Sequence, residues 1–448
     1  MNGELLIDAV SSVRPMIGRR GLLRNGGLLA GAFALGLPGR GWARVADPST
    51  GIAGQWPAVT QLLEGAVADH SLPGAMAAFG WGTAAPQFIA RGTLGPDNPA
   101  PLTGDSLFRM YSMTKPLTGM IAMMLIDEGK LGLDQPLAEI FPAFAHMQVA
   151  VDPMKGLNAA PAKAAITMRH LMTHSSGLCY PGIGEDAVSH ALMAQGVALG
   201  RVSRQPQVAG AVPPVGPEAF LRLAAAAPLL FEPGTQWSYS MGLDVLGLVI
   251  EHVEGKPLDV VMGERLFGPL GMTSSYFTVP ADQAHRLTSD LVLKDGHPAV
   301  VDPGVNSIYV TPPAFAFGGA GLVSSPADYD RFLAMIVGGG AWNGTRVMSA
   351  RAVALGVSNL LPPAVDTART WIAGWGFGAG GKVGLMRHAG TYGWSGLAGT
   401  VGFVQTLLGL RAGLYIQMVP SSDSPLPKAF PDAVRSDLLA RPPADGGA

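Results

Sequence analysis

The chain has 448 residues, of which 48% are hydrophobic and only 14% are charged, so it can bury one large core or two ordinary ones and is not disordered. Its net charge of -2 gives no electrostatic basis for binding nucleic acid or an anionic membrane surface. The single cysteine, Cys179, excludes an internal disulfide bond and a cysteine-based metal cluster.

Residues 1–46 have the pattern of a targeting segment and linker. The basic stretch Arg19–Arg24 resembles a twin-arginine signal, and a mostly apolar run, Asn25–Gly39, follows it. That run is too short to span a bilayer, and the small residues of Gly41–Ala43 suit cleavage. We therefore predict a periplasmic protein with no stable membrane insertion after signal removal. If the segment is not processed, the protein would be cytoplasmic. The alternative interpretation of the apolar run is a surface helix. Met16 is an alternative start codon.

Three regular elements are predicted before residue 130. Pro57–Ala68 has the apolar spacing of an amphipathic helix, and Ala75–Phe79 with Gln87–Arg91 predicts a β-hairpin. A helix is expected over Ser112–Glu128, with apolar residues on all sides, and Gly129 ends it. A helix of this kind belongs in a core.

The start of this last helix carries the first candidate for chemistry, an S-x-x-K pair formed by Ser112 and Lys115. Residues three apart lie on one helix face, which brings a hydroxyl and an amine within hydrogen-bonding reach. Pro116 favours a helix start at or just before Ser112, since proline is best tolerated in a first turn. The helix dipole and apolar neighbours disfavour a charged lysine, and a neutral amine can activate serine as a nucleophile. The motif is short enough to arise by chance.

The middle of the chain, residues 130–315, is predicted to be mostly helical. Ile166–Leu178 begins as a short helix and ends in a polar turn, Val202–Gly216 is expected to be a loop or flap, and helices are predicted over Pro217–Ala227 and Gly242–Glu251. His170 and His174 have a spacing that can bind zinc, but no glutamate follows His170 and no third ligand is evident. We expect capping and buried hydrogen bonding from them, and no metal.

Tyr239 lies in a polar turn before the Gly242–Glu251 helix, where a phenol can point into a cleft, although spacing alone favours an ordinary surface tyrosine. Further along, Gly318–Ser325 is glycine-rich without a dinucleotide-binding or P-loop spacing. It is predicted to be a strand edge leading into a helix. The last predicted elements are the Pro326–Gly338 helix, a strand over Val383–Gly390, a turn at Gly393–Gly396, two antiparallel strands over Leu397–Val404 and Leu414–Val419, and a closing helix over Asp432–Leu439.

The order of three motifs resembles that of the serine β-lactamase and penicillin-binding protein superfamily. S-x-x-K comes first, Tyr-Ser-x second, and a small glycine-containing triad on a late strand third. The detail resembles class C β-lactamases and, more closely, family VIII carboxylesterases. The matching pieces are Ser112–Pro116, Thr173–Leu178, Pro233–Ser240, Gly318–Ser325 and His388–Gly390. The likeness runs from about Ile52 to the C-terminus, and no G-x-S-x-G motif points to an α/β-hydrolase.

The resemblance implies a role for each matching residue and no cofactor. Ser112 would be the acyl-accepting nucleophile, Lys115 would take or relay its proton, and Tyr239 would act as base and then as acid. The backbone N–H groups of Ser112 and Thr391 would form the oxyanion hole. Substrate contacts are expected from Tyr111, Met241, His388, Ala389, Gly390 and Trp394.

Two positions depart from the lactamase pattern. Met241 replaces an asparagine that would bond an amide side chain, and His388 replaces the lysine that begins the late triad. Both changes favour neutral esters over anionic amides. An alternative alignment places Trp394-Ser395-Gly396 at the triad; we rank it second because those residues are predicted to lie in a turn. Even without that alignment, Trp394 is expected to wall an apolar acyl or alcohol pocket nearby.

We therefore expect an α+β, β-lactamase/transpeptidase-like fold. An antiparallel sheet flanked by helices would come from residues 47–129 and 316–448, with residues 130–315 as an inserted, mostly helical domain and the site between them. The favoured function is hydrolysis of short- to medium-chain carboxylic esters of small molecules through an acyl-enzyme. The alternatives are a β-lactamase or D-amino-acid peptidase using the same serine, and a non-catalytic penicillin-binding sensor. The sequence does not predict an oligomeric state.

Overall fold

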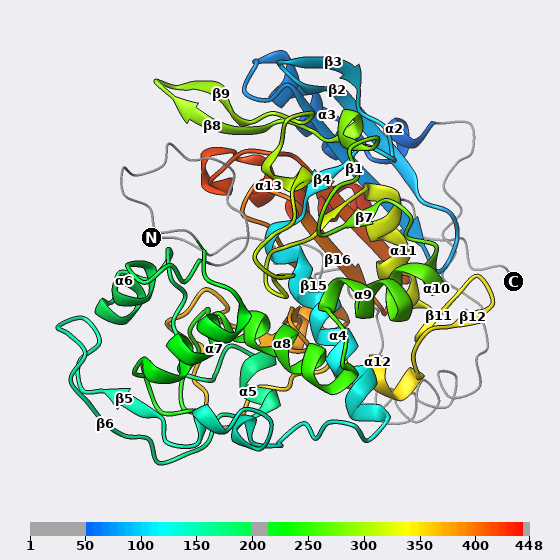
Figure 1. Ribbon diagram of the computed structural model, residues 1–448. Helices are drawn as coiled ribbons and strands as arrows, with labels where there is room; N and C mark the ends of the chain where they lie inside the picture. Colours follow the sequence, from blue (N-terminus) through cyan, green and yellow to red (C-terminus); the bar gives the residue numbers. More distant parts are fainter. Residues whose placement is uncertain (1–50, 199–213, 442–448) are drawn as a thin grey trace, which may run out of the picture.

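The computed structural model describes residues 51–198 and 214–441 and places an eight-stranded antiparallel sheet at the centre of the molecule (Figure 1). Its strands, in spatial order, are β13 (Gly376–Phe377), β14 (Lys382–Val383), β15 (Thr391–Ser395), β16 (Val401–Gln405), β17 (Leu410–Tyr415), β1 (Gly74–Trp81), β2 (Gln87–Gly95) and β3 (Asn98–Pro101). The first strand of the chain pairs with the last, from Met76 opposite Tyr415 to Trp81 opposite Leu410. The two ends of the described chain therefore build one sheet.

Helices cover both faces of this sheet. On one face, α3 (Pro57–Ala68) packs against α13 (Leu426–Ala440), and Trp56, just before α3, stacks on Phe79 of β1 at 3.9 Å. On the other face lie α11 (Pro326–Val337) and α4 (Thr114–Asp127). All of β1 except its last residue is buried, as expected for a strand covered on both sides.

The segment between residues 130 and 315 carries most of the remaining helices. They are α5 (Met168–Met172), α6 (Ala187–Met193), α7 (Pro217–Ala226), α8 (Gly242–Glu254), α9 (Leu258–Met262) and α10 (Gly268–Leu270), with a π-helical turn over Gly263–Phe267. The segment also forms the hairpins β5 (Gln148–Ala150) with β6 (Ala159–Pro161) and β8 (Asp290–Lys294) with β9 (His297–Asp302). The division into domains at residues 130 and 315 stays a prediction.

A small three-stranded sheet joins the parts of the chain that meet at the S-x-x-K pair. In it β10 (Val323–Ser324) lies between β4 (Phe108–Arg109) and β7 (Ser275–Tyr276). The other described elements are α2 (Ile52–Gln55), α12 (Ala350–Gly356) and the hairpin of β11 (Ala341–Trp342) with β12 (Thr345–Arg346). Because β4 leads directly into the turn before α4, the glycine-rich segment that ends in β10 is fixed beside that turn.

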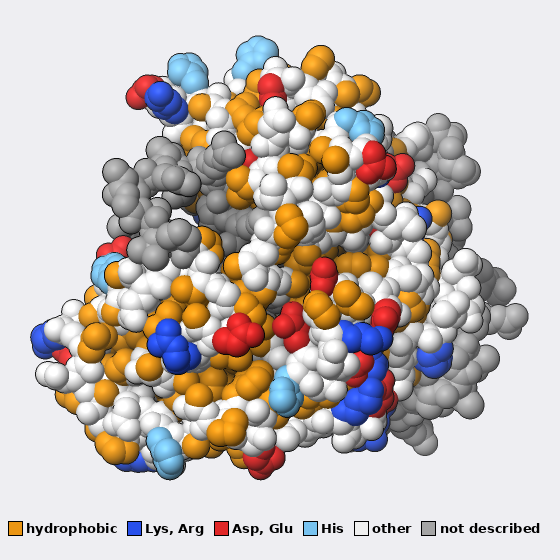
Figure 2. Space-filling view, viewed as in Figure 1, with side chains coloured by type: hydrophobic (Ala, Val, Ile, Leu, Met, Phe, Trp, Pro, Cys, Tyr) orange, Lys and Arg blue, Asp and Glu red, His pale blue; other side chains and the backbone are white. Residues whose placement is uncertain are grey.

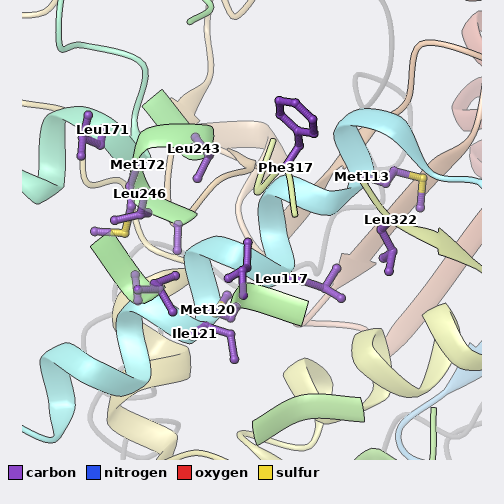
Figure 3. Packing of buried hydrophobic residues seen from close by; sticks show 14 of the residues in the cluster. Met113, Leu117, Met120, Ile121, Leu171, Met172, Leu243, Leu246, Phe317 and Leu322 are labelled. Carbon is purple, nitrogen blue, oxygen red and sulfur yellow. The ribbon is translucent and has the colours of Figure 1, made fainter. Parts of the chain in front are cut away.

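The α4 helix lies at the centre of the main core (Figure 3). Every residue from Thr114 to Leu125 is buried, which agrees with the prediction of an all-round apolar helix. Side chains from α5, α8 and the segment before β10 surround it: Leu171, Met172, Leu243, Leu246, Phe317 and Leu322. Full burial of each large apolar side chain contributes about 1.5–3 kcal/mol. The helix is therefore a rigid support for groups at its N-terminal end.

Most of the predicted helices and strands are present. The helix over Pro57–Ala68 has the predicted bounds, and the hairpin, the α7 and α8 helices and the α11 helix are confirmed. The strand predicted over Val383–Gly390 is wrong, because β14 ends at Val383 and a 3₁₀ turn, Met386–His388, precedes β15.

Two predicted features lie outside the described residues. They are the targeting segment over residues 1–46 and most of the loop predicted over residues 202–216. Within residues 51–198 and 214–441, no helix combines the length and the hydropathy that a membrane crossing needs. On the face shown in Figure 2, charged side chains of both signs lie close together, so this face presents no surface of a single charge.

Candidate active site

Ser112 lies on a turn rather than inside the helix. A 3₁₀ turn, Tyr111–Met113, follows β4, and α4 begins two residues later than predicted, at Thr114. Tyr111 has a φ of +45°, which is unusual for a residue with a side chain. Such conformations cost on the order of 1–3 kcal/mol and persist where neighbouring contacts hold them. One such contact is the hydrogen bond of 2.6 Å from Thr114 Oγ1 to the Tyr111 carbonyl oxygen.

The hydroxyl of Ser112 contacts both groups that the sequence motifs pointed to. Its Oγ lies 3.3 Å from Lys115 Nζ and 2.7 Å from the phenol oxygen of Tyr239. Lys115 is fully buried, and its Nζ also donates a hydrogen bond of 2.8 Å to the carbonyl oxygen of Gly319. The same nitrogen lies 4.6 Å from the centre of the Tyr239 ring. A hydroxyl from the turn before α4, an amine from α4 and a phenol from the loop before α8 are thus brought together.

His174 supports the loop that carries Tyr239. Its Nδ1 accepts a hydrogen bond of 3.1 Å from the Ser240 backbone N–H, and its ring lies 4.6 Å from the Tyr239 ring. Burial, and then the charge of Lys115, lower the pKa of His174 well below its usual value, so the imidazole is neutral. His170 closes a capping box at the start of α5 with Thr167. The predicted capping and hydrogen-bonding roles of both histidines are confirmed.

Aromatic rings surround the Tyr239 phenol. Tyr180 stacks on Tyr239 at 4.9 Å, Trp394 Nε1 lies 3.5 Å from the phenol oxygen, and the Trp371 ring lies 5.5 Å from the Tyr239 ring. Trp371 is 41% exposed, so this wall is open to solvent on one side. Motif reasoning missed Tyr180 and Trp371. Tyr180 follows the polar turn of residues 173–178 closely enough to have been considered, whereas no local pattern singles out Trp371.

The late strand brings Trp394, and not His388, to the site. Trp394 and Ser395 belong to β15, which packs against the turn that holds Ser112. Gly396 follows β15, and a Cβ atom there would overlap the carbonyl oxygen of Met110. The prediction that Trp394-Ser395-Gly396 lie in a turn between strands is therefore wrong for its first two residues. The alternative alignment, with Trp394 in the position of the lactamase lysine, fits the structure.

His388 occupies a different place. It lies in the 3₁₀ turn before β15, is 4% exposed, and stacks on Trp375 at 4.4 Å. Arg387 Nε donates a hydrogen bond of 2.8 Å to His388 Nε2. His388 is therefore held by Trp375 and Arg387 in the turn before β15, whereas Trp394 is the residue that reaches the Tyr239 phenol.

The residues after His388 are bound to the turn after β16. Gln405 donates a hydrogen bond of 3.0 Å to the Ala389 carbonyl oxygen, and Thr406 N donates one of 2.8 Å to that of Gly390. Thr391 pairs with Gln405 in the sheet, at the end of β15 away from the tryptophan. Strands rise about 3.4 Å per residue, so the Thr391 N–H lies roughly 10 Å along β15 from Trp394, the residue of this strand that reaches the site. The predicted roles of Ala389, Gly390 and Thr391 at the substrate are not supported.

Tyr111 and Met241 also take supporting positions. The Tyr111 phenol donates a hydrogen bond of 2.6 Å to Asp290 Oδ2, and its ring packs with Ala398 and Val419. Met241 is 1% exposed in the main core at the start of α8, where its N–H bonds to the carbonyl oxygen of Cys179. Both side chains stabilise the elements around the site, in contrast to the predicted contact with substrate.

Comparison with known proteins agrees with this architecture. Residues 59–436 match the β-lactamase family model. The chain belongs to the β-lactamase family. Among solved structures, EstCE1, described as a hydrolase with promiscuous acyltransferase activity, superimposes with a TM-score of 0.68 over 86% of this chain and 98% of its own, at 23% identity. That likeness shows the fold, and it confirms the predicted β-lactamase/transpeptidase-like α+β class.

Two related sequences show the extent of the similarity. Esterase EstB of Burkholderia gladioli is 32% identical over 359 residues, which cover 75% of this chain and 83% of EstB. Protein Rv1367c of Mycobacterium tuberculosis is 36% identical over 260 residues, 58% of this chain. The aligned part spans only 61% of that relative's length. The predicted resemblance to esterases within this superfamily is confirmed.

Proposed function

We propose that the protein hydrolyses neutral carboxylic esters of small molecules through an acyl-enzyme on Ser112. The observation that carries the proposal is the double contact of the Ser112 hydroxyl, with the Lys115 amine on one side and the Tyr239 phenol on the other. A serine is a weak nucleophile until a neighbouring base takes its proton. Both candidate bases are in place, and membership of a family with a named esterase supports the choice of substrate.

In the acylation step, Ser112 Oγ attacks the ester carbonyl carbon while its proton passes to the Tyr239–Lys115 pair. The negative charge on the carbonyl oxygen is held by backbone N–H groups, one from Ser112 and one from Leu397 after Gly396. Leu397 takes the role first assigned to Thr391, since the triad moves to Trp394-Ser395-Gly396. The phenol of Tyr239 then protonates the departing alcohol. Water repeats the sequence on the acyl-enzyme, which releases the acid and restores Ser112.

The ester preference rests on the aromatic side chains around the Tyr239 phenol, which contacts Ser112. Trp394 stands where a lactamase has the lysine that holds a substrate carboxylate, and its indole supplies an apolar surface instead. Trp371 and Tyr180 extend that surface. Short- to medium-chain acyl or alcohol groups without charge would bury apolar area there, whereas an anionic amide would lose its cationic partner.

The test compares p-nitrophenyl butyrate with nitrocefin, using wild type and Ser112→Ala. We expect ester turnover to exceed nitrocefin turnover and to be abolished in Ser112→Ala. Ser358→Ala is the matched control, because that hydroxyl bonds a local carbonyl, that of Leu355, and its loss should leave turnover unchanged. A fluorophosphonate probe followed by peptide mass spectrometry should label Ser112.

Each rival function predicts a different result. Nitrocefin turnover far above ester turnover would favour a β-lactamase or a D-amino-acid peptidase. Binding of a penicillin with no turnover and no fluorophosphonate label would favour a sensor. Ester cleavage that survives Ser112→Ala would refute the acyl-enzyme itself.

We also propose that the protein is exported to the periplasm. The support is the twin-arginine-like stretch at residues 19–24 followed by the apolar run in the sequence. Fractionation of cells that express the full chain should find activity in the periplasm. Replacing Arg19 and Arg20 by lysine should retain it in the cytoplasm, and an unchanged distribution would refute the proposal.

A further inference from the structure

The glycine-rich segment before β10 forms the support on which Lys115 rests. Thr118 Oγ1 donates a hydrogen bond of 2.6 Å to the carbonyl oxygen of Gly318, and Lys115 Nζ donates one of 2.8 Å to that of Gly319. Both donors come from α4. The glycines of this segment do not have the spacing of a dinucleotide-binding motif or a P-loop. They instead allow the backbone to lie directly against α4.

A buried carboxylate anchors the other side of this support. Asp244, in the first turn of α8, accepts a hydrogen bond of 2.9 Å at Oδ1 from the Gly319 N–H. A Cβ atom at position 319 would overlap Asp244 Oδ2, so only glycine allows this approach. Gly319 thus binds Asp244 through its N–H and Lys115 through its carbonyl oxygen, and it couples the α8 carboxylate to the α4 amine.

Within the part of the chain that the structure describes, Lys115 is the cation that acts on the charge of Asp244. The side chain is fully buried, and Oδ2 has no hydrogen-bond partner within the described residues. Burial raises the pKa of Asp244, and the positive charge of Lys115 acts against that rise. A buried carboxylate without a nearby positive charge is strongly disfavoured, so the amine and the carboxylate depend on each other.

We infer that Asp244 is a positioning residue for Lys115. Asp244 fixes the Gly319 backbone, whose carbonyl oxygen orients the amine. Its negative charge also balances the positive charge that Lys115 carries after taking the Ser112 proton. The inference rests on the proposed function, because it assigns Lys115 a share in that proton transfer. Among the described residues, the titratable groups that face the Asp244–Lys115 pair are His174 and Tyr180, both after α5, and Tyr239 before α8.

The test is Asp244→Asn in the full chain, assayed with p-nitrophenyl butyrate from pH 5 to 10. The amide oxygen can still accept the Gly319 N–H, so the substitution removes mainly the charge. We expect kcat to fall on the order of 10- to 100-fold, part of the roughly 10²- to 10⁴-fold that a positioned base contributes. Loss of a negative charge lowers the pKa of each neighbouring group, so the acidic limb of the kcat/KM profile should move to lower pH.

Asp437→Asn is the matched control. That carboxylate is also buried and also accepts backbone N–H groups, from Ala58 and Val59, but it lies on α13 away from the site. It should leave the position of the acidic limb unchanged. A merely structural role of Asp244 would lower the amount of folded enzyme without moving that limb.

Asp244→Glu provides the second variant in case Asp244→Asn does not fold. It keeps the charge but displaces the carboxylate, so kcat should fall while the acidic limb stays in place. An unchanged kcat in Asp244→Glu, or an unmoved limb in folded Asp244→Asn, would overturn the inference. Absence of ester hydrolysis in wild type would instead refute the proposed function, which keeps the two failures distinguishable.

Discussion

Exchanging Trp394 and His388 for alanine, one at a time, separates the two alignments of the late triad. Trp394 has its Nε1 3.5 Å from the Tyr239 phenol and its ring 5.8 Å from the Tyr239 ring. An aromatic pair contributes about 0.5–1.5 kcal/mol beyond its buried area, and a long hydrogen bond adds about 0.5 kcal/mol. The loss of about 1–2 kcal/mol should lower kcat/KM roughly 5- to 30-fold.

His388→Ala should instead lower the stability of the protein and leave its activity nearly unchanged. Its ring stacks on Trp375 at 4.4 Å in a buried turn, so truncation should cost about 1–3 kcal/mol of stability. The value of kcat/KM, measured with p-nitrophenyl butyrate well below the melting temperature, should stay within about twofold of wild type. The reasoning is refuted if His388→Ala loses activity while retaining its stability, or if Trp394→Ala leaves kcat/KM unchanged.

Three further outcomes are expected elsewhere in the molecule. Arg109 and Asp302 form a fully buried ion pair, so Arg109→Met should lower the free energy of unfolding in urea by about 3–5 kcal/mol. The control Lys155→Met, which removes an exposed ion pair, should have no measurable effect on that free energy. Burial raises the pKa of the Cys179 thiol to about 12, so iodoacetamide at pH 8 should label it only after unfolding; rapid labelling of native protein would contradict this. The depressed pKa of His174 means that its contribution to stability is present above pH 6.5 and is lost as pH falls, by up to about 1.4 kcal/mol per pH unit. His174→Gln should flatten that dependence, and an unchanged slope would exclude His174 as its source.

The sequence predicted those parts of the site that depend on local geometry. Ser112 and Lys115 are three residues apart where a 3₁₀ turn leads into the apolar helix α4, and this spacing brings the hydroxyl and the amine together. The helix over Pro57–Ala68 follows from its apolar periodicity in the same way. Tyr239 lies 127 residues from Ser112, and only the order of motifs shared with a family predicted their meeting.

The tertiary structure decided which late residue reaches Ser112. His388 and Trp394 are six positions apart, and local pattern predicted a strand at the wrong one of them. The real strand begins at Thr391, because Ala389 and Gly390 are bound to the turn after β16 and so fix the register of β15. Shifting a strand boundary changes which side chains face the site, and a register is set by partners distant in sequence.

Tyr180, Trp371 and Asp244 also acquired their places at the site through tertiary packing alone. Each contacts the cluster across a long sequence separation, Asp244 through the backbone of Gly319 and the two aromatic residues through the Tyr239 ring. The sequence by itself determined the nucleophile pair, the core helix that carries it and the class of fold, because these follow from short periodic patterns and motif order. The three-dimensional fold decided the aromatic wall beside Tyr239 and the counter-charge of the lysine, because both are contacts between elements that no local pattern encodes.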